Sequence, residues 1–142
     1  MRLFTSLLLL TCVFVSSLAW AHSDEYLDTV AAPHGGQLRM AGAFHFELVV
    51  TATALQLHVT DHAGKAVSTL GASGNAVTLG KAGKQTVALS PRSENVLEGT
   101  GTFDPAQPLK AVVTVSIPGH DPLTARFDTA KLHQGHHTES AK

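Results

Sequence analysis

Histidine is the residue type of this 142-residue chain that could do most chemistry: nine are present, and cysteine occurs once, as Cys12. Histidine is the commonest metal ligand and titrates near neutral pH. All nine histidines lie beyond residue 21, whereas Cys12 lies before it. The pattern predicts imidazole coordination of a transition metal without thiolate ligands, and it does not identify the metal.

The main group of candidate ligands comprises His34, His45, Glu47 and His58. His34 opens a His-Gly-Gly turn, whose glycines let the backbone bend sharply. Imidazole and carboxylate ligands suit zinc, copper(II), nickel or cobalt. One alternative stays open: His45 and His58 face solvent, and Glu47 and His58 form an ordinary cross-strand ion pair. Dense ligand motifs such as His-Glu-x-x-His are absent from the sequence.

Two expected strands must position these residues. Apolar side chains occupy the even positions of 44–50 and the odd positions of 55–59, which directs them to the core. His45, Glu47 and His58 then face outward. A two-residue turn at 52–53 would place Glu47 opposite His58, with Cβ atoms about 5 Å apart.

Histidines near the two ends form two further candidate sites. His22 would begin the mature chain, so its α-amine and imidazole could chelate copper(II) together, unless its position is a coincidence. His133, His136 and His137 form a His-rich tract of the kind that binds metal loosely. The alternative for this tract is a solubilising end.

The remaining polar candidates are assigned to turns. Asp61 and His62 begin one expected turn and His120 occupies another, so these histidines are expected to contribute little to metal binding. Met40 is the one methionine left after removal of a leader. Because copper(I) prefers sulfur ligands, the chain suits a divalent ion better.

Residues 1–21 are expected to be a secretory signal peptide. Arg2 precedes the largely apolar run 3–18, and Ala19-Trp20-Ala21 supplies small residues for cleavage before His22. The run is short for a membrane span, so an uncleaved anchor is the less favoured alternative. We therefore expect an exported protein with no membrane span after cleavage.

The rest of the chain has the pattern of one all-β domain. We expect an irregular leader at 22–33, a β-sandwich at 34–130 and a flexible His-containing tail at 131–142. The expected strands are short, alternating and separated by turn residues: 36–41, 43–51, 54–60, 65–70, 75–79, 84–90, 95–99, 109–117 and 122–128. About seven to nine such strands predict a single antiparallel, immunoglobulin-like β-sandwich.

Composition excludes several functional classes. Ten Lys and Arg against eleven Asp and Glu give a net charge of −1, which argues against a nucleic-acid partner. Gly-x-Ser-x-Gly and phosphate-binding glycine loops are absent, so we expect no enzyme.

Three segments together resemble a small periplasmic module of bacterial heavy-metal efflux systems of the resistance–nodulation–division class. They are Pro33-His34-Gly35-Gly36, Phe44-His45-Phe46-Glu47-Leu48-Val49 and Leu57-His58-Val59-Thr60-Asp61-His62-Ala63-Gly64-Lys65. The resemblance covers roughly residues 33–128, including Leu97-Glu98-Gly99-Thr100-Gly101 and Ala125-Arg126-Phe127. It implies a β-sandwich, a periplasmic location and involvement with metal ions.

Residue by residue, His34, His45 and Glu47 match that family best, and Asp61 matches an acidic turn. His58 departs from the pattern, since an aromatic residue is more usual there. His22 resembles the first residue of small copper-resistance β-barrel proteins. Their later ligands, an aspartate and a histidine two residues apart, are missing, because His120-Asp121 has the wrong order and spacing.

The sequence thus predicts a periplasmic protein that binds a divalent transition metal, as a chaperone or buffer in heavy-metal efflux or resistance. Its expected partners are the metal ion and periplasmic components of an efflux pump. The competing hypothesis is an interaction module that docks on an envelope complex and whose histidines are not ligands.

Overall fold

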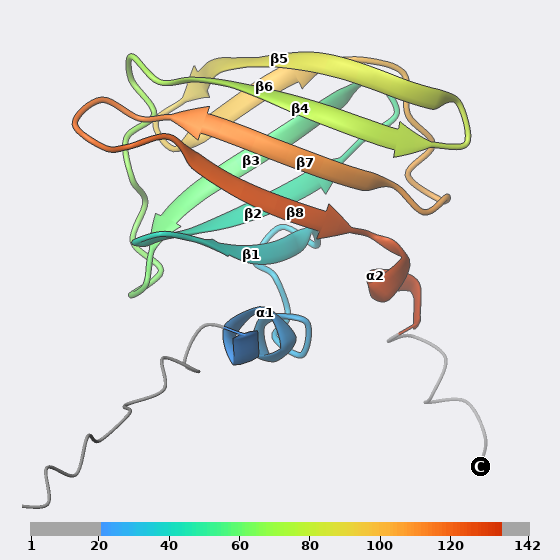
Figure 1. Cartoon of the computed structure of the whole chain (residues 1–142), viewed down its shortest axis with the longest axis horizontal. Helices are drawn as coiled ribbons and strands as arrows, with labels where there is room; N and C mark the ends of the chain where they lie inside the picture. The colour runs from blue at the N-terminus through green and yellow to red at the C-terminus, as the bar shows by residue number, and fades with distance from the viewer. Residues whose placement is uncertain (1–20, 135–142) are drawn as a thin grey trace, which may run out of the picture.

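A computed structural model of the chain describes residues 21–134, which are mainly antiparallel β-strands with a short helix at each end (Figure 1). The elements are α1 (Ala21–Leu27), β1 (Gln37–Ala41), β2 (Phe44–Val50), β3 (Ala54–Asp61), β4 (Ser73–Gly80), β5 (Gly83–Ser93), β6 (Val96–Thr100), β7 (Lys110–Ser116), β8 (Leu123–Asp128) and α2 (Ala130–Gln134).

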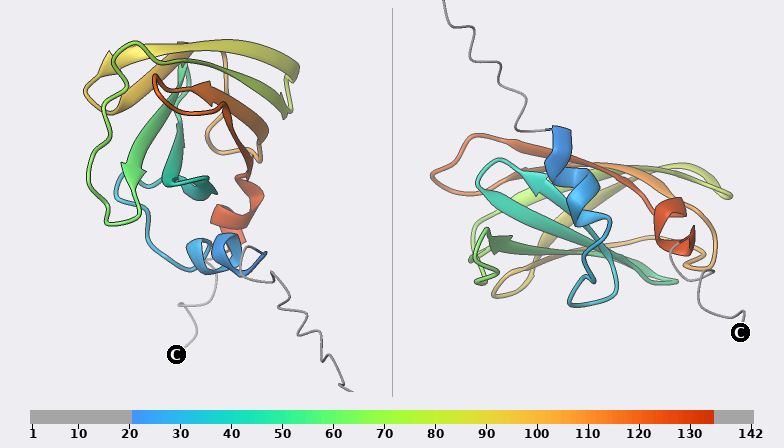
Figure 2. Two further views of the ribbon diagram at one scale, coloured as in Figure 1. Left: turned by 60° about the vertical axis from the view of Figure 1, so that its left-hand side comes forward. Right: turned by 90° about the horizontal axis from the view of Figure 1, so that it is seen from below.

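The eight strands form one sheet in the order β1-β2-β3-β6-β5-β4-β7-β8. β5 lets the sheet curl over, because its residues 83–89 pair with β4 and its residues 90–93 pair with β6. A bulge between Pro91 and Ser93 marks this corner. The two halves of the sheet face each other across the core as a nearly closed barrel (Figure 2).

Side chains of β1 close the gap to β8. The Gln37 side-chain Nε2 donates to the Asp128 carbonyl at 3.0 Å, and the Asp128 backbone N donates to Gln37 Oε1 at 2.7 Å. Arg39 Nε donates to the Arg126 carbonyl at 3.1 Å. The amide of Gln37 thereby replaces a peptide group, and three backbone groups of the edge strand β8 have partners on β1.

Alternation along β2 and β3 explains the core. Phe46, Leu48, Leu55, Leu57 and Val59 are each at most 1% exposed. Apolar residues of β5, β7 and β8 meet them from the opposite side of the barrel. The prediction of an all-β antiparallel domain is confirmed. The immunoglobulin-like arrangement is not confirmed, because the described strands belong to one sheet.

The segment 65–70 is not a strand, contrary to the prediction; Ala66 alone forms an isolated bridge, to Thr60. Its backbone donors bond to strand and loop ends, with Val67 N donating to the Val59 carbonyl and Thr69 N to the Glu94 carbonyl. Leu70 is 83% exposed. The segment therefore crosses one end of the barrel.

The expected irregular leader instead begins with α1, which lies against β1 (Figure 2). Asp28, just after the helix, accepts a hydrogen bond from Arg39 and one from Lys131 Nζ at 3.0 Å. Burial acts to raise the pKa of Asp28, but these two cations outweigh it and lower that pKa below its ordinary 3.8. This ionic contact, together with buried Leu27, fixes the segment.

The first residues of the expected tail, 131–134, belong to α2, and residues 135–142 lie outside the described part. Thr129 orients this helix, since its backbone N donates to the Leu109 carbonyl and its Oγ1 accepts from Leu109 N. The proposed signal peptide, apart from Ala21, also lies outside the described residues. Within 21–134, neither helix has the length and apolar character to cross a membrane.

Candidate metal centre

Glu47 is the centre of the candidate site, and both of its carboxylate oxygens are hydrogen-bonded. Oε1 accepts from the backbone N of His34 at 2.8 Å and from that of Gly36 at 3.0 Å. Oε2 lies 2.8 Å from His34 Nδ1. The His-Gly-Gly turn thus folds over the outer face of β2, with Gly35 at a φ of 75° that glycine adopts readily.

This contact explains a burial that alternation alone does not predict. Glu47 shares the outward face of β2 with His45, yet its side chain is only 3% exposed. A buried carboxylate needs compensating donors, and the turn supplies them. The glutamate therefore anchors the turn.

The same bond orients the His34 ring. An ionised carboxylate only accepts hydrogen bonds, so Nδ1 of His34 carries the proton that it shares with Glu47. In the neutral ring, Nε2 then has an unprotonated lone pair. Metal-ligating histidines typically donate their second ring N–H to a carboxylate in this way. The His34 side chain is 49% exposed, so an ion can reach this ring from solvent.

His58 completes the group. It lies directly opposite Glu47 in the β2–β3 register, as predicted, because residues 52 and 53 form the turn closed by the Thr51 N to Ala54 carbonyl bond. Its ring stacks on that of His34, with centroids 3.8 Å apart and planes 15° apart. Burial lowers the pKa of His58 below its ordinary 6.5, His34 lowers it further, and Glu47 raises it in part.

His45 belongs to a different pair. Its ring stacks on His62, with centroids 4.9 Å apart and planes 28° apart. Asp61 Oδ1 accepts from the backbone N of Ala63 and of Lys65, which fixes the adjoining turn. The structure therefore separates His45 from the rest of the predicted group. His34, Glu47 and His58 lie together, whereas His45 pairs with His62.

The assignment of His62 to an uninvolved turn missed this contact. His62 directly follows β3 and stands two positions after Thr60, the cross-strand partner of His45, a spacing that the sequence could have indicated. His120 is placed apart from both pairs, where it packs edge-on against Phe44 at 4.9 Å.

The end histidines add no described ligand geometry. The backbone of His22 belongs to α1 and that of His133 to α2, while the side chains of both are outside what the structure describes. His136 and His137 also lie beyond it. Their predicted roles stay predictions.

The described side chains are not assembled around one point. Residues 21–134 contain no group of three or more His, Cys, Asp or Glu arranged to hold an ion. The reason is geometric: ring lone pairs lie in the ring planes, so the nearly parallel His34 and His58 cannot both aim at one ion. Coordination by both requires one ring to rotate.

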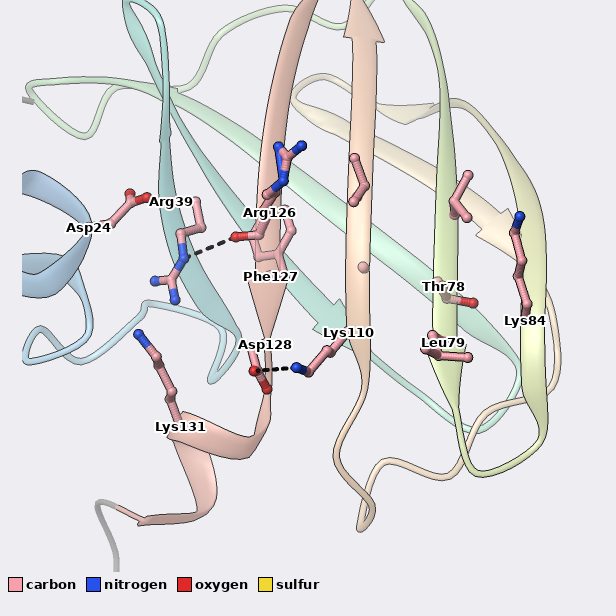
Figure 3. Close-up of a pocket in the computed structure, with 13 residues that line it drawn as sticks. Asp24, Arg39, Thr78, Leu79, Lys84, Lys110, Arg126, Phe127, Asp128 and Lys131 are labelled. Atoms are coloured by element: carbon pink, nitrogen blue, oxygen red, sulfur yellow. Dashed lines mark hydrogen bonds and ion pairs between the residues drawn. The ribbon is translucent and has the colours of Figure 1, made fainter. Parts of the chain in front are cut away.

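A groove of about 630 Å³ lies elsewhere, over β4, β7 and β8 (Figure 3). No described histidine lines it. The residues that line it include Val77, Val112, Lys84 and Arg126. The two histidine pairs therefore do not belong to this groove.

Comparison of the chain with models of known protein families, with curated protein sequences and with solved structures found no match.

The lowered pKa values of His58 and His45 predict a pH dependence of the metal-free protein. Burial is the largest cause for both. As the pH falls below about 6.5, the unfolded chain takes up protons that the folded chain resists, so the free energy of unfolding decreases. This stabilising contribution is fully present above that pH.

Urea unfolding near pH 7.5 and near pH 5.5, above the range of ordinary carboxylates, measures the effect. The double variant His45→Gln, His58→Gln should show a smaller loss than the original chain. An unchanged pH dependence in the double variant would assign the effect to other groups.

Proposed function

We propose that the protein is exported to the periplasm and binds a divalent transition metal at His34 and His58, as a non-enzymatic chaperone or buffer in heavy-metal efflux or resistance. The observation that supports this is the 2.8 Å contact between Glu47 and His34 Nδ1, which in the neutral ring leaves Nε2 unprotonated, on a side chain that is 49% exposed. Efflux-pump components remain the expected partners on the resemblance stated above.

Glu47 has a positioning role in this proposal. Its oxygens already accept from two backbone amides and one imidazole, so its recruitment as a direct ligand would cost those bonds. His34 Nε2, one nitrogen of His58 and solvent would form the coordination shell.

The rotation of His58 out of its stack is compatible with useful affinity. An aromatic stacking contact contributes about 1 kcal/mol. Micromolar binding corresponds to about −8 kcal/mol, so the ion can compensate for a lost stack several times over. The lowered pKa of His58 favours the neutral ring that a metal requires.

Calorimetric titration of residues 22–142 with Zn²⁺, Cu²⁺, Ni²⁺ and Co²⁺ tests the proposal. We expect at least one ion to bind more tightly than about 100 µM, which corresponds to about −5.5 kcal/mol. His34→Ala should weaken that binding about tenfold or more, since it removes the oriented ligand.

Two controls separate the sites. His120→Ala also removes one histidine, but from outside both stacked pairs, and should leave the affinity unchanged. Deletion of 133–142 should remove only weak binding. If no ion binds more tightly than about 100 µM, the competing interaction-module function is favoured. If tail deletion abolishes all binding, the sheet is not the metal site.

A further inference from the structure

The end of the β1–β2–β3 face that carries His45 also carries a thioether. Met40 lies directly opposite His45 in the β1–β2 register. Directly opposed residues on one face have Cβ atoms about 5 Å apart. Both side chains are half-buried, and His62 stacks on His45 from the turn beyond β3.

These three side chains are positioned by independent backbone elements. β1 places Met40, β2 places His45, and the Asp61 turn places His62. The rings of His45 and His62 are further apart and more inclined than those of His34 and His58. His62 is exposed, so its ring can change orientation when an ion binds.

The ligand types differ from those of the first group. A thioether is a soft ligand that favours copper(I), whereas imidazole with carboxylate support favours divalent ions. Asp61 is not available as a hard oxygen ligand through Oδ1, because that atom accepts from two backbone amides of its own turn.

We propose that Met40, His45 and His62 form a second metal site, which binds a soft monovalent ion such as copper(I) or silver(I). The site uses none of the side chains assigned to the divalent ion and does not depend on that assignment. Two sites of different softness would then lie on one face, separated by a two-residue step of about 7 Å along β2.

Silver(I) is the probe, because it does not change oxidation state under ordinary conditions. The measurement on residues 22–142 is the ε-methyl NMR signal of Met40, followed during a titration and assigned by comparison with Met40→Leu. The methyl signal should shift to saturation at one equivalent of silver. Met40→Leu conserves volume and removes the sulfur, so silver affinity should fall about tenfold or more.

The converse variants keep the two proposals distinguishable. Met40→Leu and His62→Gln should leave zinc affinity unchanged, and His34→Ala should leave silver affinity unchanged. A silver affinity that Met40→Leu does not alter, or a methyl signal that does not shift at saturation, would overturn this second site. Loss of zinc binding in His34→Ala alone bears only on the first.

Discussion

Glu47→Ala should lower the free energy of unfolding by about 3 kcal/mol and Tm by roughly 10 °C. The substitution leaves the backbone N–H groups of His34 and Gly36 and the His34 ring without their acceptor. Each buried group left unpaired costs about 1–3 kcal/mol, and the half-exposed His34 ring recovers part of this from water. Urea and thermal unfolding of the metal-free protein measure the loss.

Glu98→Ala is the matched control. Glu98 lies on β6, which β3 separates from β2, accepts from Gln56 Nε2 at 2.9 Å and is 3.4 Å from Arg92 Nε. Its side chain is 23% exposed, and partly exposed pairs of this kind contribute less than about 1 kcal/mol. If both alanine variants lose the same stability, Glu47 is not the anchor that its hydrogen bonds indicate.

Glu47→Gln separates the structural role from the effect on metal binding. The glutamine carbonyl can still accept from the two backbone amides, so the stability loss should be about half that of the alanine variant. Its amide group would donate toward His34 Nδ1, which then has to accept, and the proton moves to Nε2. We expect ¹⁵N NMR to report this tautomer change, together with about tenfold weaker divalent-metal binding. An unchanged tautomer with full affinity would contradict the positioning role.

Alternation was sufficient to predict the strands that hold the site. The apolar positions of 44–50 and 55–59 determine the buried face, and a two-residue turn at 52–53 then pairs Glu47 with His58. Side-chain period is a local property that the sequence reveals directly, whereas a longer turn would have shifted the pairing by a residue or more.

Contacts between distant segments could not be predicted in the same way. Alternation places Glu47 on the outer face, and only the fold of the His34 turn buries it. Met40 looked isolated because its partner His45 lies across a strand pair. The 65–70 segment has a strand-like composition, but it meets only the end of β3 that β6 leaves unpaired, where a single bridge forms between Thr60 and Ala66.

Gly36→Ala should produce the other large effect, about 3 kcal/mol of destabilisation together with weaker metal binding. A Cβ at residue 36 would lie 2.4 Å from the Leu48 carbonyl oxygen and 2.9 Å from Val49 Cγ2. The first of these is backbone within a paired strand, so the turn has to move instead. That movement lengthens the bond from Gly36 N to Glu47 and displaces His34, the proposed ligand.

Alanine substitutions at two other glycines serve as controls. One separates steric crowding from backbone strain, and the other separates a local effect on metal binding from destabilisation of the whole fold. A Cβ at residue 35 would have no neighbour within 4 Å, but the φ of 75° is unfavourable for alanine. Gly35→Ala should therefore lower the free energy of unfolding by only about 1–2 kcal/mol. Gly99→Ala would bring a Cβ to 2.3 Å from the Ala88 carbonyl oxygen, between β5 and β6 and away from the His34 turn. It should therefore destabilise the fold while the folded fraction binds zinc normally. If Gly36→Ala also retains full zinc affinity per folded molecule, the approach of the turn to Glu47 does not control the metal site.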